Sequence, residues 1–238
     1  MKNVWTITSR ELQSYFVSPI AYVISALFLV AMGYLFSLIL INSQDASMQS
    51  TFSNMMFLLL LLAPALTMKL LADEQRMGTI ELLLTSPVND WQVVLGKFLG
   101  SLILFAVMLV GPTLYYVLIL KVFGSPDYGP ILTGYLGLLL LGGSFLAVGV
   151  FTSALTQNQV IAYFAGLVIL ILLWIADAAG GVAGTGSIGN MVSYLAITQH
   201  YNNFFRGVID TTDVVYALSV IAVALFLATQ VLQTRRWR

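Results

Sequence analysis

The chain has 238 residues, of which 59% are hydrophobic and only 8% are charged, and its formal net charge is zero. Soluble domains carry roughly a quarter charged residues, so this composition excludes a soluble fold and predicts that lipid is the solvent. A net charge of zero argues against broad electrostatic binding of nucleic acid, and the absence of cysteine excludes disulfides and thiolate metal sites.

The first segment predicts an amphipathic helix. It has no apolar core followed by a small-residue cleavage site, so we expect no cleavable signal peptide. Over residues 3–17 one helix face carries the apolar side chains of Val4, Ile7, Leu12, Tyr15 and Phe16, and Lys2, Arg10, Glu11 and Gln13 lie elsewhere. This pattern favours a helix in the inner headgroup layer before the chain enters the membrane at residues 18–19. An ordinary surface anchor is the alternative.

Six apolar stretches are long enough, or nearly so, to cross the hydrocarbon core, which needs about 20 residues. They must be helical, because a lone segment in lipid can satisfy its backbone only in that way. They are residues 19–41, 52–72, 93–120, 131–155, 160–177 and 214–232. The sequence therefore predicts an all-α integral membrane protein with a single transmembrane domain over residues 1–238.

The basic residues predict the orientation of these spans. Six spans place both termini on one side, and the basic residues expected there are Lys2, Arg10, Lys69, Arg76, Lys97, Arg235, Arg236 and Arg238. Only Lys121 and Arg206 fall on the other side. Because lysine and arginine are enriched in cytoplasmic loops, we expect both termini in the cytoplasm and the protein in the cell inner membrane.

The connections differ in character. Residues 156–159, "TQNQ", form a tight inner turn, so the fourth and fifth spans make a helical hairpin. The outer segment 177–213 begins with a glycine-rich run, residues 179–189, that we expect to be flexible. Its second part has apolar spacing typical of one or two short helices at the outer interface.

Charge is concentrated in the inner connector between the second and third spans. The charged residues there are Asp73, Glu74, Arg76, Glu81, Asp90 and Lys97. Gly78 permits a sharp turn, and the following "TIELLLTSP" predicts a short helix with Thr79 as its cap and Pro87 beyond its end. A short rigid element attached to two spans would act as a lever. The alternative is a solvated loop whose charges mark the membrane edge.

This connector carries a family resemblance. Its pattern, acidic–Glu–x–Arg–x–Gly–Thr–x–Glu–Leu–Leu followed by Ser–Pro, resembles the signature of type-2 ABC exporter permeases, and most closely the gliding-motility-associated subfamily. Three further stretches fit in order: "SYFVSPIAYV" at 14–23, "DWQVVLGKFLG" at 90–100, and "FFRGVIDTTDVVY" at 204–216 with the terminal "RRWR". The resemblance therefore extends over nearly the whole chain.

The resemblance implies an architecture and a power source. It implies six spans, an amphipathic N-terminal helix, and a coupling helix between the second and third spans that docks on a nucleotide-binding ATPase subunit. Two permease subunits would pair as a homodimer or heterodimer, and ATP and magnesium would be bound by the ATPase. Carried over residue by residue, the coupling interface would be Asp73, Glu74, Arg76, Gly78, Thr79 and Glu81.

The residues themselves agree on one negative point. No G-x-x-x-x-G-K-[ST] loop is present, since the only Gly-Lys pair, Gly96–Lys97, has Trp91 where the first glycine should be. The chain is thus expected to bind no ATP by that route and to be no enzyme itself. Export driven by a separate ATPase is the leading function. A non-transporting mechanical or scaffold subunit of an ATPase-driven envelope complex is the first alternative.

Other chemistry is weakly supported. A secondary carrier is the second alternative, but it would need a buried carboxylate within a span, and the sequence shows none. Ser144 in "GGSF" and His200, the only histidine, could be proposed as a catalytic dyad, although Ser144 lies mid-span and small residues there usually serve close packing. His200 is expected to be a polar interfacial residue. The glycine-rich fourth span is our candidate for a subunit interface, with packing inside one subunit as the alternative.

Overall fold

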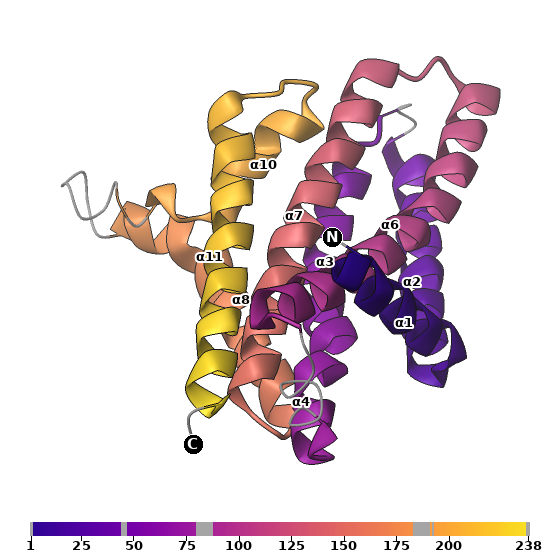
Figure 1. The fold of residues 1–238 in the computed structure, drawn as a ribbon. Helices are drawn as coiled ribbons and strands as arrows, with labels where there is room; N and C mark the ends of the chain where they lie inside the picture. Colours follow the sequence, from indigo (N-terminus) through magenta and orange to yellow (C-terminus); the bar gives the residue numbers. More distant parts are fainter. Residues whose placement is uncertain (1, 44–46, 80–87, 183–190, 192, 237–238) are drawn as a thin grey trace.

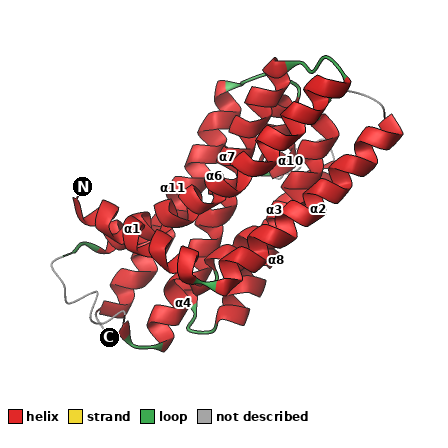
Figure 2. Cartoon of the chain, turned by 90° about the vertical axis from the view of Figure 1, so that its right-hand side faces the viewer, coloured by secondary structure: helices red, strands yellow, loops and turns green. Residues whose placement is uncertain are grey.

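The computed structural model describes residues 2–43, 47–79, 88–182, 191 and 193–236, and this part of the chain is helical without strands (Figures 1 and 2). The helices are α1 (Lys2–Val17), α2 (Pro19–Ser43), α3 (Gln49–Thr67), α4 (Lys69–Arg76), α6 (Asp90–Phe123), α7 (Tyr128–Leu155), α8 (Gln159–Val182), α10 (Ile197–Phe205) and α11 (Thr211–Arg236). Within these residues, six helical stretches are long and apolar enough to cross a membrane.

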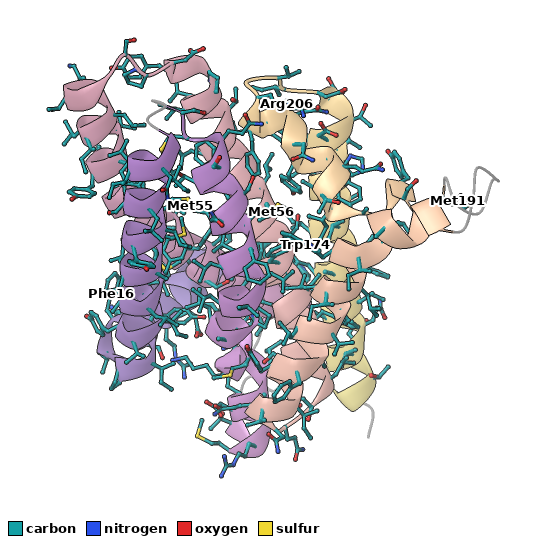
Figure 3. The ribbon with its side chains drawn as sticks, turned by 180° about the vertical axis from the view of Figure 1, so that it is seen from behind. Phe16, Met55, Met56, Trp174, Met191 and Arg206 are labelled. Carbon is teal, nitrogen blue, oxygen red and sulfur yellow. The ribbon has the colours of Figure 1, made fainter. Side chains whose placement is uncertain are left out.

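The ends of the bundle differ. One end, which we call the connector end, holds α4, the α7–α8 turn and the C-terminal end of α11 (Figure 1). The opposite end holds the α6–α7 turn and α10, and Arg206 lies there (Figure 3).

Side chains fix several of the helix starts. Asn89 and Gln92 form a capping box at the start of α6, and Asp127 accepts a 3.0 Å hydrogen bond from the Gly129 amide at the start of α7.

Helix α7 is the centre of the bundle. In its most apolar stretch 78% of residues are buried, compared with 17% to 22% in α2, α8 and α11. Its glycines let neighbours approach: a side chain at Gly134, Gly137 or Gly142 would collide with Phe52, Phe204 or Phe105 of the same chain. These glycines of the fourth span therefore serve packing inside one subunit, and the role of this span at a subunit interface stays a prediction.

Two predicted spans differ in shape from the expectation. The second span divides at Met68 into α3 and α4, which the continuous apolar run did not indicate. Helix α8 continues through Val182, into the glycine-rich run that we expected to be flexible, because glycine lowers helix stability by only about 1 kcal/mol and does not remove the backbone donor. Residues 183–190 of that run lie outside the described residues.

The short elements follow the sequence pattern in part. A helix is present over residues 2–17, and it lies obliquely across α6 (Figure 1). Of the apolar residues predicted to share one face, Tyr15 is buried inside the molecule, whereas Phe16 is 52% exposed and lies at the edge of the molecule (Figure 3). Helix α10 supplies one short helix between the fifth and sixth spans. The helix predicted after Thr79 falls on residues 80–87, outside the described part of the chain.

Candidate functional site

The N-terminal helix is seated on the third span through two glycines. A Cβ atom at Gly96 would meet Ile7, and one at Gly100 would meet Glu11, so only glycine permits this close approach. The Thr8 hydroxyl lies in the same contact, 2.9 Å from the Val4 carbonyl and 3.1 Å from the Gly96 carbonyl. Helix α1 is thus fixed against the first turns of α6, directly after the connector.

A buried ion triad joins three helices at this contact. The Lys97 ammonium on α6 lies 3.1 Å from Glu11 on α1 and 2.9 Å from Glu74 on α4. The Lys97 side chain is 4% exposed, and the two glutamates are 13% and 17% exposed. A lysine is almost never buried unless it is paired, so these contacts hold α1, α4 and α6 in one arrangement. We refer to Lys97, Glu11 and Glu74 as the Lys97 triad.

Helix α4 begins with a cap supplied by another helix. Its own N-cap residue, Met68, makes no side-chain capping bond. Instead, the Ser153 hydroxyl on α7 accepts from the Leu71 and Ala72 amides, both at 3.0 Å, and donates to the Met68 carbonyl at 2.9 Å. These groups are the ones that a broken helix leaves unpaired, so Ser153 stabilises the division at Met68.

The other face of α4 is bonded to the α7–α8 hairpin. The Gln75 amide donates to the Ala154 carbonyl at 2.8 Å, and the Gln159 amide donates to the Asp73 carboxylate. Helix α4 is thus a short helix that contacts α7 and α8 on one face (Figure 1). On the other face the ion pairs of Lys97 link it to α6 and α1.

The corner between α1 and α2 is tied to the same region. The Lys69 ammonium donates to the Ser18 hydroxyl at 2.8 Å and lies 5.1 Å from the centre of the Tyr15 ring. The Tyr15 hydroxyl donates to the Leu66 carbonyl at 2.8 Å. Burial raises the pKa of Tyr15 well above its ordinary value, so the phenol remains a neutral donor.

The predicted interface residues occupy different positions around α4. Asp73 and Glu74 are partly buried and bonded, whereas Arg76, Gly78 and Thr79 are exposed. Gly78 has a φ of +70°, a left-handed conformation that ends the helix as its sequence position predicted. The Thr79 hydroxyl donates back to the Glu74 carbonyl at 3.3 Å. Glu81 lies outside the described residues.

The comparison with known protein families covers almost the whole chain. Residues 5–237 match the family described as ABC-2 family transporter protein. The chain belongs to the ABC-2 family. Together with six long apolar helices, membership makes it a multi-pass membrane permease of the ABC transporter class, in the inner membrane.

Two curated relatives of this ABC-2 family chain carry the same name. The inner membrane transport permease YhhJ of Escherichia coli K12 and that of Shigella flexneri are each 30% identical to it over 145 residues. The similarity covers 60% of this chain and 37% of each relative. The chain therefore spans well under half the length of the curated relatives that it matches.

Sequence reasoning missed several residues that position α4 in the permease. Glu11 was placed off the apolar face of α1, yet it pairs with Lys97 because the close approach at Gly100 brings it against α6. Ser153 and Gln159 gave no signal, since contacts across some 80 residues of sequence cannot be read from spacing within one helix. The two glycines Gly96 and Gly100, which are spaced four residues apart and permit close helix contact, were the one available sign in the sequence that another helix lies on α6.

The second polar cluster of the permease lies at the opposite end. Nδ1 of His200 lies 2.8 Å from Asp213, and Nε2 lies 2.9 Å from the Tyr194 carbonyl. The Ser144 hydroxyl donates to the Leu140 and Ala217 carbonyls, so none of these bonds joins Ser144 to His200 and the proposed dyad is not assembled. His200 is 5% exposed, and it is a buried residue that links α10 to α11 rather than an interfacial one. Among the described residues no group of three His, Asp or Glu side chains could hold a metal ion.

Proposed function

We propose that this ABC-2 family chain is the permease subunit of an exporter-type ABC transporter and that α4 with residues 77–81 is its coupling element. A separate nucleotide-binding subunit, which holds ATP and magnesium, docks on this element and drives export across the inner membrane. The observation that carries the proposal is the anchoring of α4. The Lys97 triad, Ser153 and the Gln159–Asp73 bond attach this short helix to α1, α6, α7 and α8.

The anchoring explains how a force could be transmitted. A displacement of α4 acts on α6 and α1 through the two short ion pairs of Lys97 and on α7 through side chain–backbone hydrogen bonds. Closure of the ATPase dimer would therefore shift the spans between inward- and outward-facing states as a population shift. The exposed residues Arg76, Gly78 and Thr79 remain available for the partner.

The topology and assembly follow the same proposal. The connector end faces the cytoplasm, with both termini on that side, because eight of the ten basic residues are assigned to it by the span order. A second permease subunit, identical or related, completes the transporter, and α2, α8 and α11 carry the largely unburied apolar faces available to it and to lipid. The four ordered sequence stretches support membership of the gliding-motility-associated subfamily.

The test is whether an ATPase binds the connector. The detergent-solubilised protein is purified from its native membrane, and the co-purifying ATPase activity is measured for the wild type and for Arg76→Glu combined with Glu81→Lys. We expect the double variant to lose about tenfold or more of the retained ATPase, which corresponds to about 1.4 kcal/mol of binding energy. Lys121→Glu, a charge reversal at the exposed opposite end of α6, is the matched control and should retain it.

Two results would contradict the proposal. One is an ATPase that remains bound to the double variant at the level of the wild type. The other is a permease that is purified from its native membrane with no ATPase at all.

A further inference from the structure

A long apolar groove lies between α6 and α7, in the half of the bundle next to the turn that joins these two helices (Figure 1). We call it the α6–α7 groove. Its volume is about 750 Å³, and its described walls are aliphatic and aromatic side chains with one threonine, Thr113. The Thr113 hydroxyl is already bonded to the Leu109 carbonyl of its own helix. The groove therefore fits a hydrocarbon occupant, because a polar group placed there would lose its hydration without a partner.

The length of the groove matches one leaflet of a membrane. On α6 the groove runs from Ala106 to Leu118, a rise of about 18 Å for a helix that rises about 1.5 Å per residue. The hydrocarbon of one leaflet is about 15 Å thick, half of the bilayer core. Tyr128, the exposed first residue of α7, lies at the groove, and tyrosine is enriched where the hydrocarbon meets the headgroups. The groove thus has the length and the end that one acyl chain requires.

A cation stands at the outer end of this groove. The α6 residues that line the groove follow one another at intervals of three and four residues along its length, and Lys121 continues this series three residues after Leu118 and four after Val117. Lys121 therefore lies on the same face of α6 as the groove. Its side chain is exposed, and no carboxylate within the described ranges forms an ion pair with it. A cation above an apolar groove is complementary to a lipid whose headgroup is anionic.

The walls favour a flexible chain over a helix of a second copy. Helices associate in membranes through small residues that let their backbones approach closely. Ala106 and Thr113 are the small residues among the described walls, and the others are bulky leucine, isoleucine, valine and tyrosine side chains. Several of these bulky side chains, including Leu114 and Leu132 on opposite walls, are exposed along the open side of the groove. An acyl chain can follow such uneven walls, whereas a straight helix cannot.

We propose that the α6–α7 groove binds an anionic phospholipid, with one acyl chain between the two helices and the phosphate beside Lys121. The proposed topology places this lipid in the outer leaflet. The lipid fills space that the side chains of α6 and α7 leave open, and it lies at the end of the bundle opposite the connector. The site therefore stands or falls independently of the ATPase contact.

The headgroup is tested with two lipids that have identical acyl chains. The delipidated protein in detergent is titrated with phosphatidylglycerol or with phosphatidylcholine, whose choline cation cancels the phosphate charge, and bound lipid is counted by native mass spectrometry. We expect the wild type to prefer phosphatidylglycerol about fivefold, the effect of one lysine near a membrane surface. Lys121→Gln should lose this preference and bind phosphatidylcholine as the wild type does. A wild type without the preference, or a Lys121→Gln variant that keeps it, overturns the proposal.

The acyl chain is tested with variants that fill the groove. Leu114→Trp should weaken the binding of both lipids about fivefold, the equivalent of one or two methylene contacts, and Leu132→Trp on the opposite wall should act in the same way. Leu27→Trp, at an exposed leucine of α2 outside the groove, is the matched control and should bind both lipids as the wild type does. Unfolding midpoints without added lipid check that the three variants fold. Equal lipid binding by the groove variants and the control overturns the groove as the site.

A second copy in the groove would give a different result. The same mass spectra report the fraction of dimer, so Leu114→Trp and Leu132→Trp would lower that fraction while the binding of both lipids stayed at the level of the wild type. This outcome also overturns the lipid site.

Discussion

Lys97 is the residue on which the position of the connector depends most. A lysine that is 4% exposed must be compensated, and here two carboxylates from different helices do so. Removing one partner of a buried ionic contact leaves the others desolvated and unpaired, which costs more than the pair itself contributes. Loss of one member of the triad is therefore expected to destabilise the protein more than replacement of all three by uncharged residues.

Lys97→Met should destabilise the folded permease by about 3 kcal/mol or more, because Glu11 and Glu74 then face each other without a cation. The measurement is thermal unfolding in detergent, with Lys121→Met at an exposed site as the control. Adding Glu11→Gln and Glu74→Gln to Lys97→Met should restore most of the loss. A triple variant that is as unstable as Lys97→Met would show that the lysine acts through packing rather than charge.

Ser153→Ala should loosen α4 without unfolding the bundle. It removes the acceptor for the Leu71 and Ala72 amides, a capping loss of about 1 kcal/mol, so their hydrogen exchange should accelerate about fivefold. Ser101→Ala is the matched control, since the Ser101 hydroxyl is equally buried but bonds only to Phe98 in its own helix. Unchanged hydrogen exchange at the Leu71 and Ala72 amides would show that Ser153 does not stabilise the start of α4.

Among the elements, α7 determines how closely the others can pack. Phe105 of α6 and Phe52 of α3 occupy the space that side chains would fill at Gly142 and Gly134. The helices are thus fitted to one another by shape, since within lipid there is no hydrophobic force to draw apolar helices together. The peripheral α2 does not share this constraint, and Gly33 has open space around it.

Gly142→Ala should accordingly destabilise the permease by about 1–3 kcal/mol, because the added methyl group must displace the buried Phe105 ring. Gly33→Ala should be neutral or slightly stabilising, because alanine is the better helix former and meets no neighbour. Unfolding midpoints of the two variants in the same detergent provide the comparison. Equal unfolding midpoints would mean that a methyl group fits at Gly142 without displacing the Phe105 ring.

How much of these elements the sequence could predict depends on the range of the interaction. The six apolar helices follow from composition and length, and the turn at Gly78 follows from the conformational freedom of one residue. The division at Met68 does not, because the residue that stabilises it, Ser153, lies on another helix. For the same reason the sequence located the charged connector but did not indicate that Glu11 pairs with Lys97. The docking role of residues 73–81 stays a prediction.

At the scale of the whole molecule, the proposed topology puts the two polar ends on opposite sides of the membrane. The connector end carries the Lys97 triad and the α7–α8 turn, and the opposite end carries α10 with His200 and Asp213. Between them, α2, α8 and α11 expose apolar faces over most of their length. These faces define the zone that lipid and the proposed second permease subunit would cover.

The proposed orientation predicts which cysteines can be labelled from outside. In intact cells, after removal of the outer barrier, a membrane-impermeant maleimide should modify Asn202→Cys and should modify Gln157→Cys only once the inner membrane is opened. Both positions are exposed, so access alone decides the result. The reverse pattern would invert the topology and place the connector away from any cytoplasmic ATPase.

The cap on α4 also sets an order for synthesis and assembly. The chain is made from its N-terminus, so Glu74 and the amides of Leu71 and Ala72 exist before Lys97 does, and about 80 residues before Ser153. Until the third span has been made, α4 lacks its cation, and until the fourth span has been inserted, it also lacks its cap. The surface that the ATPase is proposed to bind is complete only after the fourth span has been inserted. A partly synthesised permease would therefore not yet be bound by its ATPase.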